Sequence, residues 1–273
     1  MRIVSLACSN TEIVHALGMA SHLVGVDNHS DHPREVVEEL PRLGPELDID
    51  VARIAALEPD LVLASLSVPG HEKVVAALDD DGFPLLTLDP TSLSDVFADI
   101  RNVARSLDVG ERGEDVVRGM EEALRHVAPL SGPVSGRDHI GPAEPVAPPS
   151  ILIEWWPKPV IAPGRLSWVH DLMEMVGADS PLGDEEVRSR PMSDEEVADL
   201  APDAIVISWC GVDPAKYRPD VVFRNPAWKD VPALKNRQVH CVPEAYLGRP
   251  GPRLVEGARA LPRVVDSVHA GGA

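Results

Sequence analysis

The sequence predicts an α/β fold of two Rossmann-like lobes with parallel sheets, joined by a long backbone helix. Three observations predict it. A helix–turn–strand unit occurs twice, as VARIAALEPDLVLAS at 51–65 and as DEEVADLAPDAIVIS at 194–208. Apolar strands alternate with helical stretches in both halves, which is typical of parallel sheets. Two amphipathic helical stretches lie between the halves. We therefore expect two lobes of one architecture with a ligand cleft between them.

The elements of the first half follow from apolar runs and their flanking turn residues. Ser9, Asn10 or Thr11 is expected to cap the first helix, and Gly18 to end it. The Pro-Asp step in the repeated unit favours a turn, because a residue before proline leaves the helical region. The expected elements are a strand at 2–6, a helix near 10–18, a strand at 23–26, a helix at 33–40, the repeated unit, a helix near 70–81 and a strand at 84–88.

The second half repeats this alternation after a helical connection at about 92–107 and 111–128. Its expected elements are a strand at 150–154, a helix near 167–176, the repeated unit, a strand near 238–242 and a helix near 252–268. The prolines and glycines of 129–149 are typical of an irregular loop. The predicted domains are an N-terminal lobe at 1–91, a helical linker at 92–128, that Pro/Gly-rich loop and a C-terminal lobe at 150–273.

Composition excludes several classes of protein. A formal net charge of −19 repels phosphate backbones, so no nucleic-acid partner is expected. Three scattered cysteines make no disulfide framework or zinc site. We see no signal peptide and no run of apolar residues long enough to span a bilayer, so no membrane insertion is expected. The chain as written is expected to be cytoplasmic; if it is instead the mature form of a longer precursor, a periplasmic or extracellular location is expected.

Candidate binding residues follow the strands, because ligands of such sheets sit beyond the carboxyl ends of the strands. Trp155 and Trp156 come directly after an apolar strand and point in opposite directions if extended, so at most one is core. The other is a candidate flat wall for a large ligand, as is Trp209. Trp168 and Trp228 are expected to pack inside the fold.

Polar loops supply a second group of candidates. His29 and His32 could reach a metal or a ligand, or belong to a capped loop that leads into the next helix. Tyr246 opens a turn rich in glycine and proline before the last helix. Within that turn, Arg249 is the better ligand contact and Arg253 the more structural residue.

Catalysis is not expected. The sequence has no G-x-S-x-G, G-x-x-x-x-G-K-[ST], H-E-x-x-H or G-x-G-x-x-G motif. Cys8 and Cys210 fall at predicted strand ends, but no neighbouring base is visible that would activate a thiol. We therefore predict that the chain is no enzyme and uses no catalytic cofactor.

Several segments together resemble one known family. IVSLACSNTEIVHALGMASHLVGVDNHSDHP, LEPDLVLAS and FPLLTLDPTSL are similar to the first lobe of the cobalamin-type, helical-backbone (class III) substrate-binding proteins of ABC transporters. EWWPKPVIAPG, SWCGVD and AYLGRPGPRLVEG resemble the signal-less cobalamin-binding branch of that family. The likeness spans nearly the whole chain except the Pro-rich segment.

The resemblance implies a corrinoid such as cobalamin, bound without catalysis, and either an ABC permease partner or a cytoplasmic corrinoid-binding role for a monomer. Heme or a ferric siderophore is the alternative ligand, with His29, His32 or His71 as an axial ligand. Glu72 and Glu195 match the acids that dock on a permease. The implied ligand contacts are His32, Ser65, Thr87, Trp155, Trp156, Ile161, Arg190, Trp209, Tyr246 and Arg249.

Overall fold

A computed structural model describes residues 1–45, 47–127 and 147–271 of the chain, which form two compact units. Unit 1 contains Met1–Glu122 and Arg249–Pro252, and unit 2 contains Ala123–Gly248 and Arg253–Ala273. The chain thus passes from unit 1 to unit 2 within helix α6 (Gly110–Arg125). The predicted domain boundaries stay a prediction, and residues 129–146 of the predicted Pro/Gly-rich loop lie outside the described residues.

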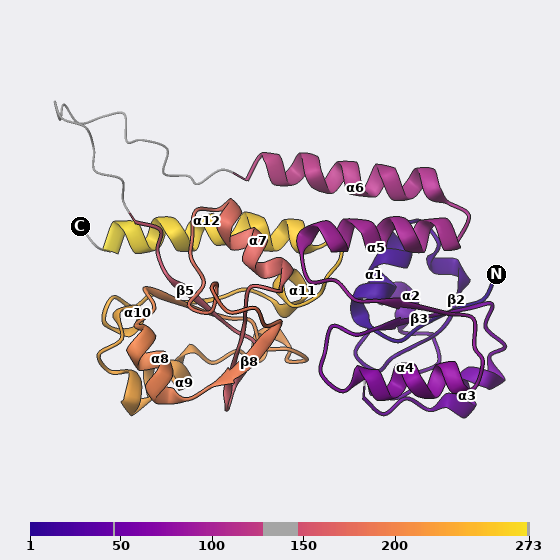
Figure 1. Ribbon diagram of the computed structural model, residues 1–273, viewed down its shortest axis with the longest axis horizontal. Helices are drawn as coiled ribbons and strands as arrows, with labels where there is room; N and C mark the ends of the chain where they lie inside the picture. The colour runs from indigo at the N-terminus through magenta and orange to yellow at the C-terminus, as the bar shows by residue number, and fades with distance from the viewer. Residues whose placement is uncertain (46, 128–146, 272–273) are drawn as a thin grey trace. The chain divides into compact units, whose positions relative to one another are not determined.

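Unit 1 is built on a parallel sheet of four strands in the order β2-β1-β3-β4 (Figure 1). Its strands are β1 (Ile3–Ser5), β2 (Leu23–Val26), β3 (Leu61–Ser65) and β4 (Leu85–Leu88). The central strands β1 and β3 are buried along their whole length, as their unbroken apolar sequences predict. Every strand of this sheet was predicted to within two residues.

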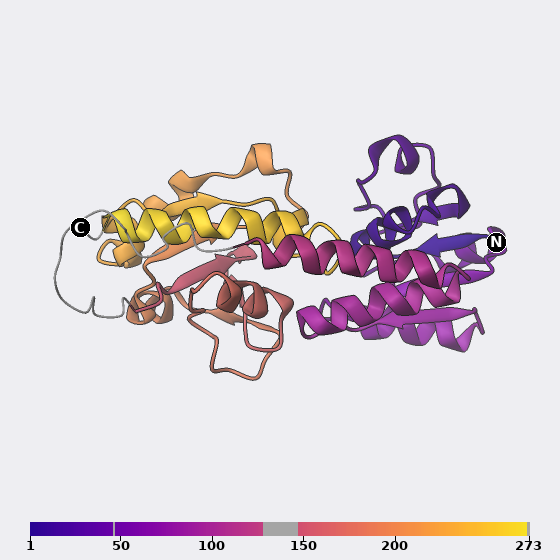
Figure 2. The ribbon, with the colours of Figure 1, turned by 90° about the horizontal axis from the view of Figure 1, so that it is seen from above.

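The helices of unit 1 connect and cover these strands. They are α1 (Cys8–Ala16), the short 3-10 helix η1 (Ala20–His22), α2 (Arg34–Val37), α3 (Val51–Ala56), α4 (His71–Asp80) and α5 (Leu93–Ser106), followed by α6. Helices α5 and α6 run side by side (Figure 2), and Arg101 of α5 forms an ion pair with Glu114 of α6 at 3.0 Å. The predicted pair of amphipathic helices is confirmed.

Two details of unit 1 differ from the prediction. Helix α1 begins at Cys8 after the extended residue Ala7, so Ser9, Asn10 and Thr11 are buried within the helix and none of them caps it. The polar residues are explained by tertiary contacts instead: Asn10 donates to the Ala64 carbonyl in β3, and Thr11 bonds to Ser5 at the end of β1. Gly18 does end this helix region, with a φ of +71° that favours glycine.

Unit 2 contains a parallel sheet of three strands in the order β10-β9-β5. Its strands are β5 (Ile151–Glu154), β9 (Ala204–Ile207) and β10 (Val239–Cys241). A second, antiparallel sheet was not predicted; it contains β6 (Trp156–Pro157), β7 (Val160–Pro163) and β8 (Ser189–Met192). Prolines within these short strands hide the alternating pattern, because proline is unusual inside a sheet.

The helices of unit 2 complete its core. They are α7 (Trp168–Met175), α8 (Asp194–Leu200), η2 (Pro214–Lys216), α9 (Pro219–Phe223), η3 (Pro226–Trp228), α10 (Pro232–Lys235), α11 (Glu244–Leu247) and α12 (Leu254–Gly271). The repeated helix–turn–strand unit is confirmed as α3–β3 and α8–β9. Within the described ranges, every helix is too short or too polar to cross a bilayer.

Candidate ligand-binding edges

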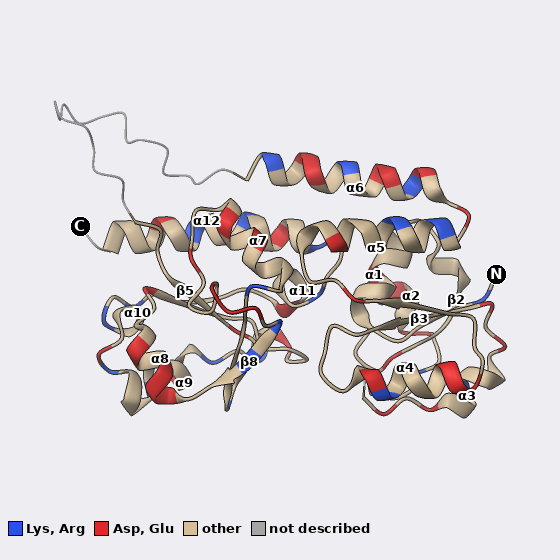
Figure 3. Cartoon of the chain, in the orientation of Figure 1, with Lys and Arg blue, Asp and Glu red and all other residues tan. Residues whose placement is uncertain are grey.

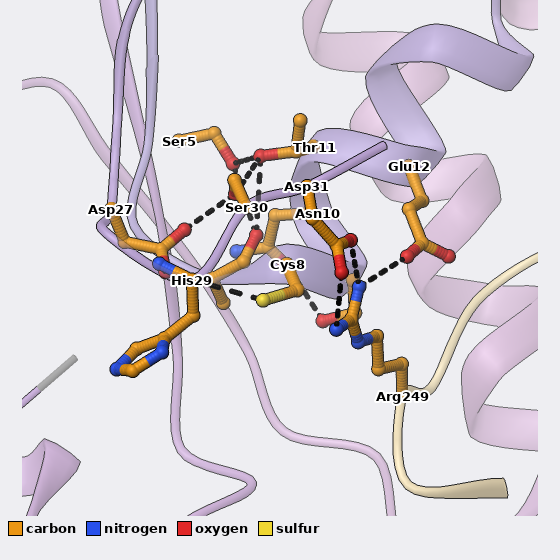
Figure 4. A network of polar contacts seen from close by, with 12 residues as sticks. Ser5, Cys8, Asn10, Thr11, Glu12, Asp27, His29, Ser30, Asp31 and Arg249 are labelled. Carbon is orange, nitrogen blue, oxygen red and sulfur yellow. Dashed lines mark hydrogen bonds and ion pairs between the residues drawn. The ribbon is translucent and has the colours of Figure 1, made fainter. Parts of the chain in front are cut away.

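The carboxyl end of the unit 1 sheet holds a buried polar network centred on Asp27, the residue after β2 (Figure 4). Asp27 is completely buried. Its Oδ1 accepts a hydrogen bond from Ser30 Oγ at 2.5 Å, and its Oδ2 accepts one from the backbone N–H of His29 at 2.7 Å. The Cys8 thiol lies 4.0 Å from the same Oδ2. Both carboxylate oxygens are therefore satisfied within unit 1.

The network continues into helix α1. Thr11 Oγ1 donates a hydrogen bond to Ser5 Oγ at 2.8 Å and lies 2.8 Å from Ser30 Oγ. Asn10 Nδ2 donates to the carbonyl oxygen of Ala64 in β3 at 3.0 Å. These bonds explain why polar residues occupy the buried face of α1: they tie the ends of neighbouring strands together rather than facing a ligand.

Arg249 belongs to unit 1 and bonds to two acids beside this network, Glu12 in α1 and Asp31 in the loop after β2. Its Nη1 donates to Glu12 Oε1 at 3.0 Å and to Asp31 Oδ1 at 2.6 Å, and its Nη2 donates to Asp31 Oδ2 at 3.2 Å (Figure 4). The Arg249 and Glu12 side chains are 8% and 2% exposed. Such a buried pair is strongly destabilised when one partner is removed. The guanidinium thus already has carboxylate partners, although its predicted ligand contact stays untested.

The other predicted residues of unit 1 lie along the same edge with different exposures. His32 is partly buried against His15 at 5.6 Å between ring centroids. Ser65 is buried and lies 2.8 Å from Ser67 Oγ, whereas Thr87 is partly buried in β4. His29 is exposed. These residues share the sheet edge with Asp27, but whether they touch a ligand stays a prediction.

His71, the remaining candidate axial ligand, begins helix α4 and is buried. Burial lowers the pKa of its imidazole, against the smaller opposing effect of Glu72. The ring is therefore held toward its neutral form, the form that binds a metal. Across the described ranges, no three His, Cys, Asp or Glu side chains are grouped so that they could hold a metal ion. Axial ligation by a single histidine stays a prediction.

The carboxyl end of the unit 2 sheet is organised around Glu154, the last residue of β5. Glu154 is 1% exposed, and its Oε1 accepts a hydrogen bond from Trp209 Nε1 at 2.8 Å. Its Oε2 has no hydrogen-bonding partner among the residues that the structure describes. Burial raises the pKa of Glu154 to about 7, and the Trp209 hydrogen bond opposes that rise. Trp209 itself is buried in the core, packed at 5.6 Å on Tyr217.

The two adjacent tryptophans face different environments, as their extended backbone predicts. Trp155 is partly buried, with its ring centroid 6.2 Å from that of Trp168, whose indole N–H donates to the Leu247 carbonyl. Trp156 is 42% exposed. Trp168 and Trp228 are both buried, which confirms their predicted packing role.

Only part of the predicted unit 2 set shares one surface. Trp156 pairs with Ile161 across β6 and β7, and Ile161 pairs with Pro191 in β8. Directly paired residues lie on the same face, so these three form one apolar strip on the antiparallel sheet. Arg190 pairs with Ala162 and therefore faces the other way. Its guanidinium forms ion pairs with Glu185, at 2.6 Å, and with Glu196.

Three further predicted residues lie at element ends. Tyr246 in α11 is partly buried, with the Arg253 guanidinium 5.7 Å from its ring centroid. Glu72 is exposed in the first turn of α4 and accepts the Gly70 backbone N–H at 2.8 Å. Glu195 is exposed in the first turn of α8, where its own backbone N–H and then the Ser193 side chain lower its pKa. Both helices carry acidic side chains (Figure 3), which is compatible with docking and equally with helix capping.

Sequence reasoning missed the two buried acids, Asp27 and Glu154. Glu154 ends the run Ile151-Leu152-Ile153, and a charged residue that ends a buried strand is unusual enough to be noticed. Asp27 stood in a loop already dense in polar groups, where nothing marked it as buried. The part that Asp27 plays in the buried network can be seen only in the fold, which brings the carboxyl ends of β1 and β2 together.

The sequence matches the family described as "Periplasmic binding protein" over residues 3–246. Among curated proteins it is 28% identical to an uncharacterized ABC transporter substrate-binding lipoprotein, YvrC, of Bacillus subtilis, over 95% of this chain and 78% of that protein. It is 27% identical to the vitamin B12-binding protein of Pectobacterium carotovorum, over 95% of this chain and 86% of that protein.

Solved structures share the fold over nearly the whole chain. The periplasmic heme-binding protein RhuT of a Roseiflexus species superposes with a TM-score of 0.78 at 27% identity, covering 98% of both chains. The periplasmic vitamin B12-binding protein BtuF of Vibrio cholerae superposes with a TM-score of 0.74 at 23% identity, covering 99% of this chain and 97% of that one.

These comparisons decide several of the predictions. They confirm the family resemblance and the two-lobed α/β fold, and they indicate a small-molecule ligand and a permease partner. They support the periplasmic or extracellular alternative and give no support to the cytoplasmic prediction. The match covers nearly all of the described sheet strands, from β1 through β10. The chain therefore belongs to the periplasmic binding protein family, whose members bind substrates for transport and are not enzymes.

Proposed function

We propose that this chain binds cobalamin or a related corrinoid without catalysis and delivers it to an ABC permease outside the cytoplasmic membrane. The observation that carries the proposal is the likeness to vitamin B12-binding proteins, which extends over 95% of the chain. The lipoprotein relative from B. subtilis supports the location. The carboxyl ends of the strands are the expected binding surface, because that is where ligands of parallel α/β sheets bind.

The strip formed by Trp156, Ile161 and Pro191 supports a flat ligand. An indole that is 42% exposed next to a partly exposed isoleucine offers apolar area that a macrocycle would cover. Nothing within the strip needs a hydrogen-bonding partner except the indole N–H. In unit 1, Ser65 and Thr87 offer small polar surfaces instead, so we expect the aromatic contact to come from unit 2.

Calorimetric titration with cyanocobalamin, cobinamide and hemin tests the proposal. We expect both corrinoids to bind, and Trp156→Ala to weaken them at least tenfold, a loss of about 1.4 kcal/mol. Leu200→Ala is the matched control, because Leu200 is an exposed apolar residue of the same unit at the end of α8. No heat with either corrinoid would reject the proposed ligand. Equal losses of affinity in Trp156→Ala and Leu200→Ala would reject the strip as the surface that binds the corrinoid.

Heme is the second candidate ligand, favoured by the 27% identity to the heme-binding protein RhuT over 98% of the chain. Hemin binding would produce a Soret band whose position reports an axial histidine. Separate His29→Ala, His32→Ala and His71→Ala variants then identify the ligand. A band that is unchanged in all three would exclude the predicted axial residues.

Docking on a permease is proposed for Glu72 and Glu195, both of which are exposed. Charge-neutralising variants Glu72→Gln and Glu195→Gln should each weaken binding to the reconstituted permease while leaving the affinity for the ligand unchanged. Glu174→Gln is a matched control, because Glu174 is an exposed acid elsewhere on unit 2. Permease binding that is weakened equally by the control would indicate a general charge effect rather than a docking pair.

A further inference from the structure

Unit 2 contains a cavity of about 360 Å³ whose lining belongs entirely to that unit. Its walls include the apolar side chains of Pro157, Val221, Val222, Pro226 and Trp228. The volume falls within the range of small-molecule sites, which are typically apolar with a few placed polar groups. Val221 is 43% exposed, so the cavity is open to solvent at α9.

Glu154 is the buried polar group of this lining. Its side chain is almost fully buried, yet Oε2 has no partner among the described residues, whereas Oε1 is held by Trp209 Nε1 at 2.8 Å. A buried polar atom without a partner destabilises the fold, so a ligand group that bonds to it relieves that cost. The strand β5 fixes the backbone of Glu154 against β9, which leaves the carboxyl group preorganised.

The hydrogen-bond pattern of the Glu154 carboxyl group indicates which ligand group would complement it. Because Oε1 accepts from Trp209, the proton of the neutral acid resides on Oε2, where it can be donated. Oε1 keeps a second lone pair that can accept. The acid therefore presents one donor and one acceptor side by side. A primary carboxamide presents the complementary acceptor and donor with the same spacing.

The charged groups around the cavity disfavour a cation. Lys158 and Arg224 belong to the lining and carry positive charge, while Asp194, at the start of α8, is the other acid. Asp194 Oδ1 already accepts a hydrogen bond from Asn225 Nδ2 at 2.9 Å. Glu154 holds its proton up to about neutral pH because burial raises its pKa to about 7. An uncharged partner matches that state.

We propose that this cavity is a binding site for a carboxamide group, anchored by the Glu154 carboxyl group and by the position that Trp209 imposes on it. The amide can belong to a free small molecule or to a side chain of a larger ligand. The first case is independent of the function proposed above. The second rests on it, because the corrin ring of cyanocobalamin carries primary amides.

Nuclear magnetic resonance of the indole N–H groups tests the site. Trp209, assigned with Trp209→Phe, is the reporter because its N–H bonds directly to Glu154. Propionamide, titrated into the millimolar range, should shift this signal, and it should bind about tenfold more tightly near pH 6 than near pH 8, following protonation of an acid with a pKa of about 7. Propylammonium is the matched charged probe and should leave the signal in place.

Two variants make the result specific. Glu154→Gln keeps a donor and an acceptor at the same position, so propionamide should still bind but without dependence on pH. Glu154→Leu should abolish binding. Propylammonium binding that strengthens with rising pH would overturn the proposal in favour of a cation site, and no response to either probe would overturn it altogether.

Cyanocobalamin distinguishes the two sources of the amide. If the amide belongs to the corrinoid, cyanocobalamin should shift the Trp209 signal and displace propionamide, and its affinity should fall about tenfold in Glu154→Leu. If cyanocobalamin binds without either effect, a free amide is the ligand of the cavity. Failure of cyanocobalamin to bind at all rejects the proposed function but leaves the propionamide result as a separate test of the cavity.

Discussion

Unit 1 and unit 2 each bury one acid at the carboxyl end of a parallel strand, and the two acids are treated differently. Asp27 follows β2 and has hydrogen bonds to both oxygens, from Ser30 and from the His29 backbone. Glu154 ends β5, and among the described residues only one of its oxygens has a partner, the Trp209 indole. Both side chains are at most 1% exposed. Burial is thus the same, and only the completeness of hydrogen bonding differs.

That difference separates a structural acid from a binding candidate. The groups around Asp27 come from α1 and from its own loop, and they give each of its carboxylate oxygens a hydrogen bond within unit 1. Glu154 lines a cavity, and burial raises its pKa. The two strands are not counterparts, since β5 pairs with the repeated strand β9 as β1 pairs with β3, whereas β2 lies beyond β1. Four measurements test whether the two acids differ as their hydrogen bonds indicate.

The largest effect is expected from Arg249→Ala in unit 1. The substitution leaves the buried Glu12 carboxylate without the guanidinium, which should lower the free energy of unfolding of unit 1 by about 3–5 kcal/mol. All five tryptophans belong to unit 2, so circular dichroism reports both units and tryptophan fluorescence reports unit 2 alone. In urea unfolding, the loss of stability of unit 1 should therefore be visible in the transition followed by circular dichroism.

Controls decide what that loss means. Arg259→Ala breaks an exposed ion pair with Glu256 and should cost no more than about 0.5 kcal/mol. Adding Glu12→Gln to Arg249→Ala should recover part of the stability, because the buried charge is removed. If Arg249→Ala left stability unchanged and weakened ligand binding instead, Arg249 would be the ligand contact that the sequence predicts.

The second effect is the pH dependence of the free energy of unfolding of unit 2. The unfolded chain releases the Glu154 proton near the ordinary pKa of 4.5, whereas the folded unit holds it to about 7. Between these values the folded state binds the extra proton, so the free energy of unfolding falls as the pH rises from 4.5 to 7. The total loss is about 3 kcal/mol, and it should be complete above that range.

Urea unfolding followed by tryptophan fluorescence at several pH values measures this loss. The difference between the native chain and Glu154→Gln isolates the contribution of this one group. A difference that is flat across the whole range would mean that Glu154 ionises at its ordinary pKa, and the contrast with Asp27 would then disappear.

The third measurement replaces Asp27 with its amide. Asp27→Asn keeps one accepting oxygen but turns an N–H group toward a donor, either Ser30 Oγ or the His29 N–H. The expected cost is about 2 kcal/mol, read from the dichroism transition. Asp31→Asn serves as the control, because Asp31 is 62% exposed and should lose far less. Equal costs would show that the network around Asp27 is not what stabilises this edge.

The smallest effect is expected for the matched change in unit 2. Glu154→Gln retains an oxygen that accepts from Trp209 and places the amide N–H₂ where Oε2 had no partner among the described residues. Near pH 4, where the folded unit holds the Glu154 proton and glutamine resembles the neutral acid, we expect a change below about 0.5 kcal/mol. A loss as large as that of Asp27→Asn would indicate that Glu154 belongs to a closed network, in conflict with the carboxamide site.

The strands and the repeated unit were predictable because their signal is local. Continuous apolar runs such as Leu61–Ser65 need burial on both faces, and that requirement is met only in a parallel sheet covered by helices. The antiparallel sheet was not predictable in the same way. Its strands are short and rich in proline, and they become strands only because Val160 and Met192 pair across the fold.

The candidate site was predictable only in part. The sequence predicted that at most one of Trp155 and Trp156 is core, because alternation along an extended chain is a local rule. Only the structure shows that Trp156 is the exposed one. The sequence could not show that Trp209 and Arg249 have hydrogen-bonding partners within the protein, because each partner lies far away along the chain. Trp209 bonds to Glu154, and Arg249 bonds to Glu12.

The fold class and the family could be predicted from the amino-acid sequence alone, and the sequence also predicts the strand edges at which a ligand is expected. Periodicity, turn residues and motif order all act over a few neighbouring residues, so they can be read without coordinates. Only the tertiary structure decided which polar residues at those edges are already satisfied and which are open. Hydrogen-bond satisfaction depends on partners from different strands, and the distance between such partners is fixed by packing rather than by their positions in the sequence.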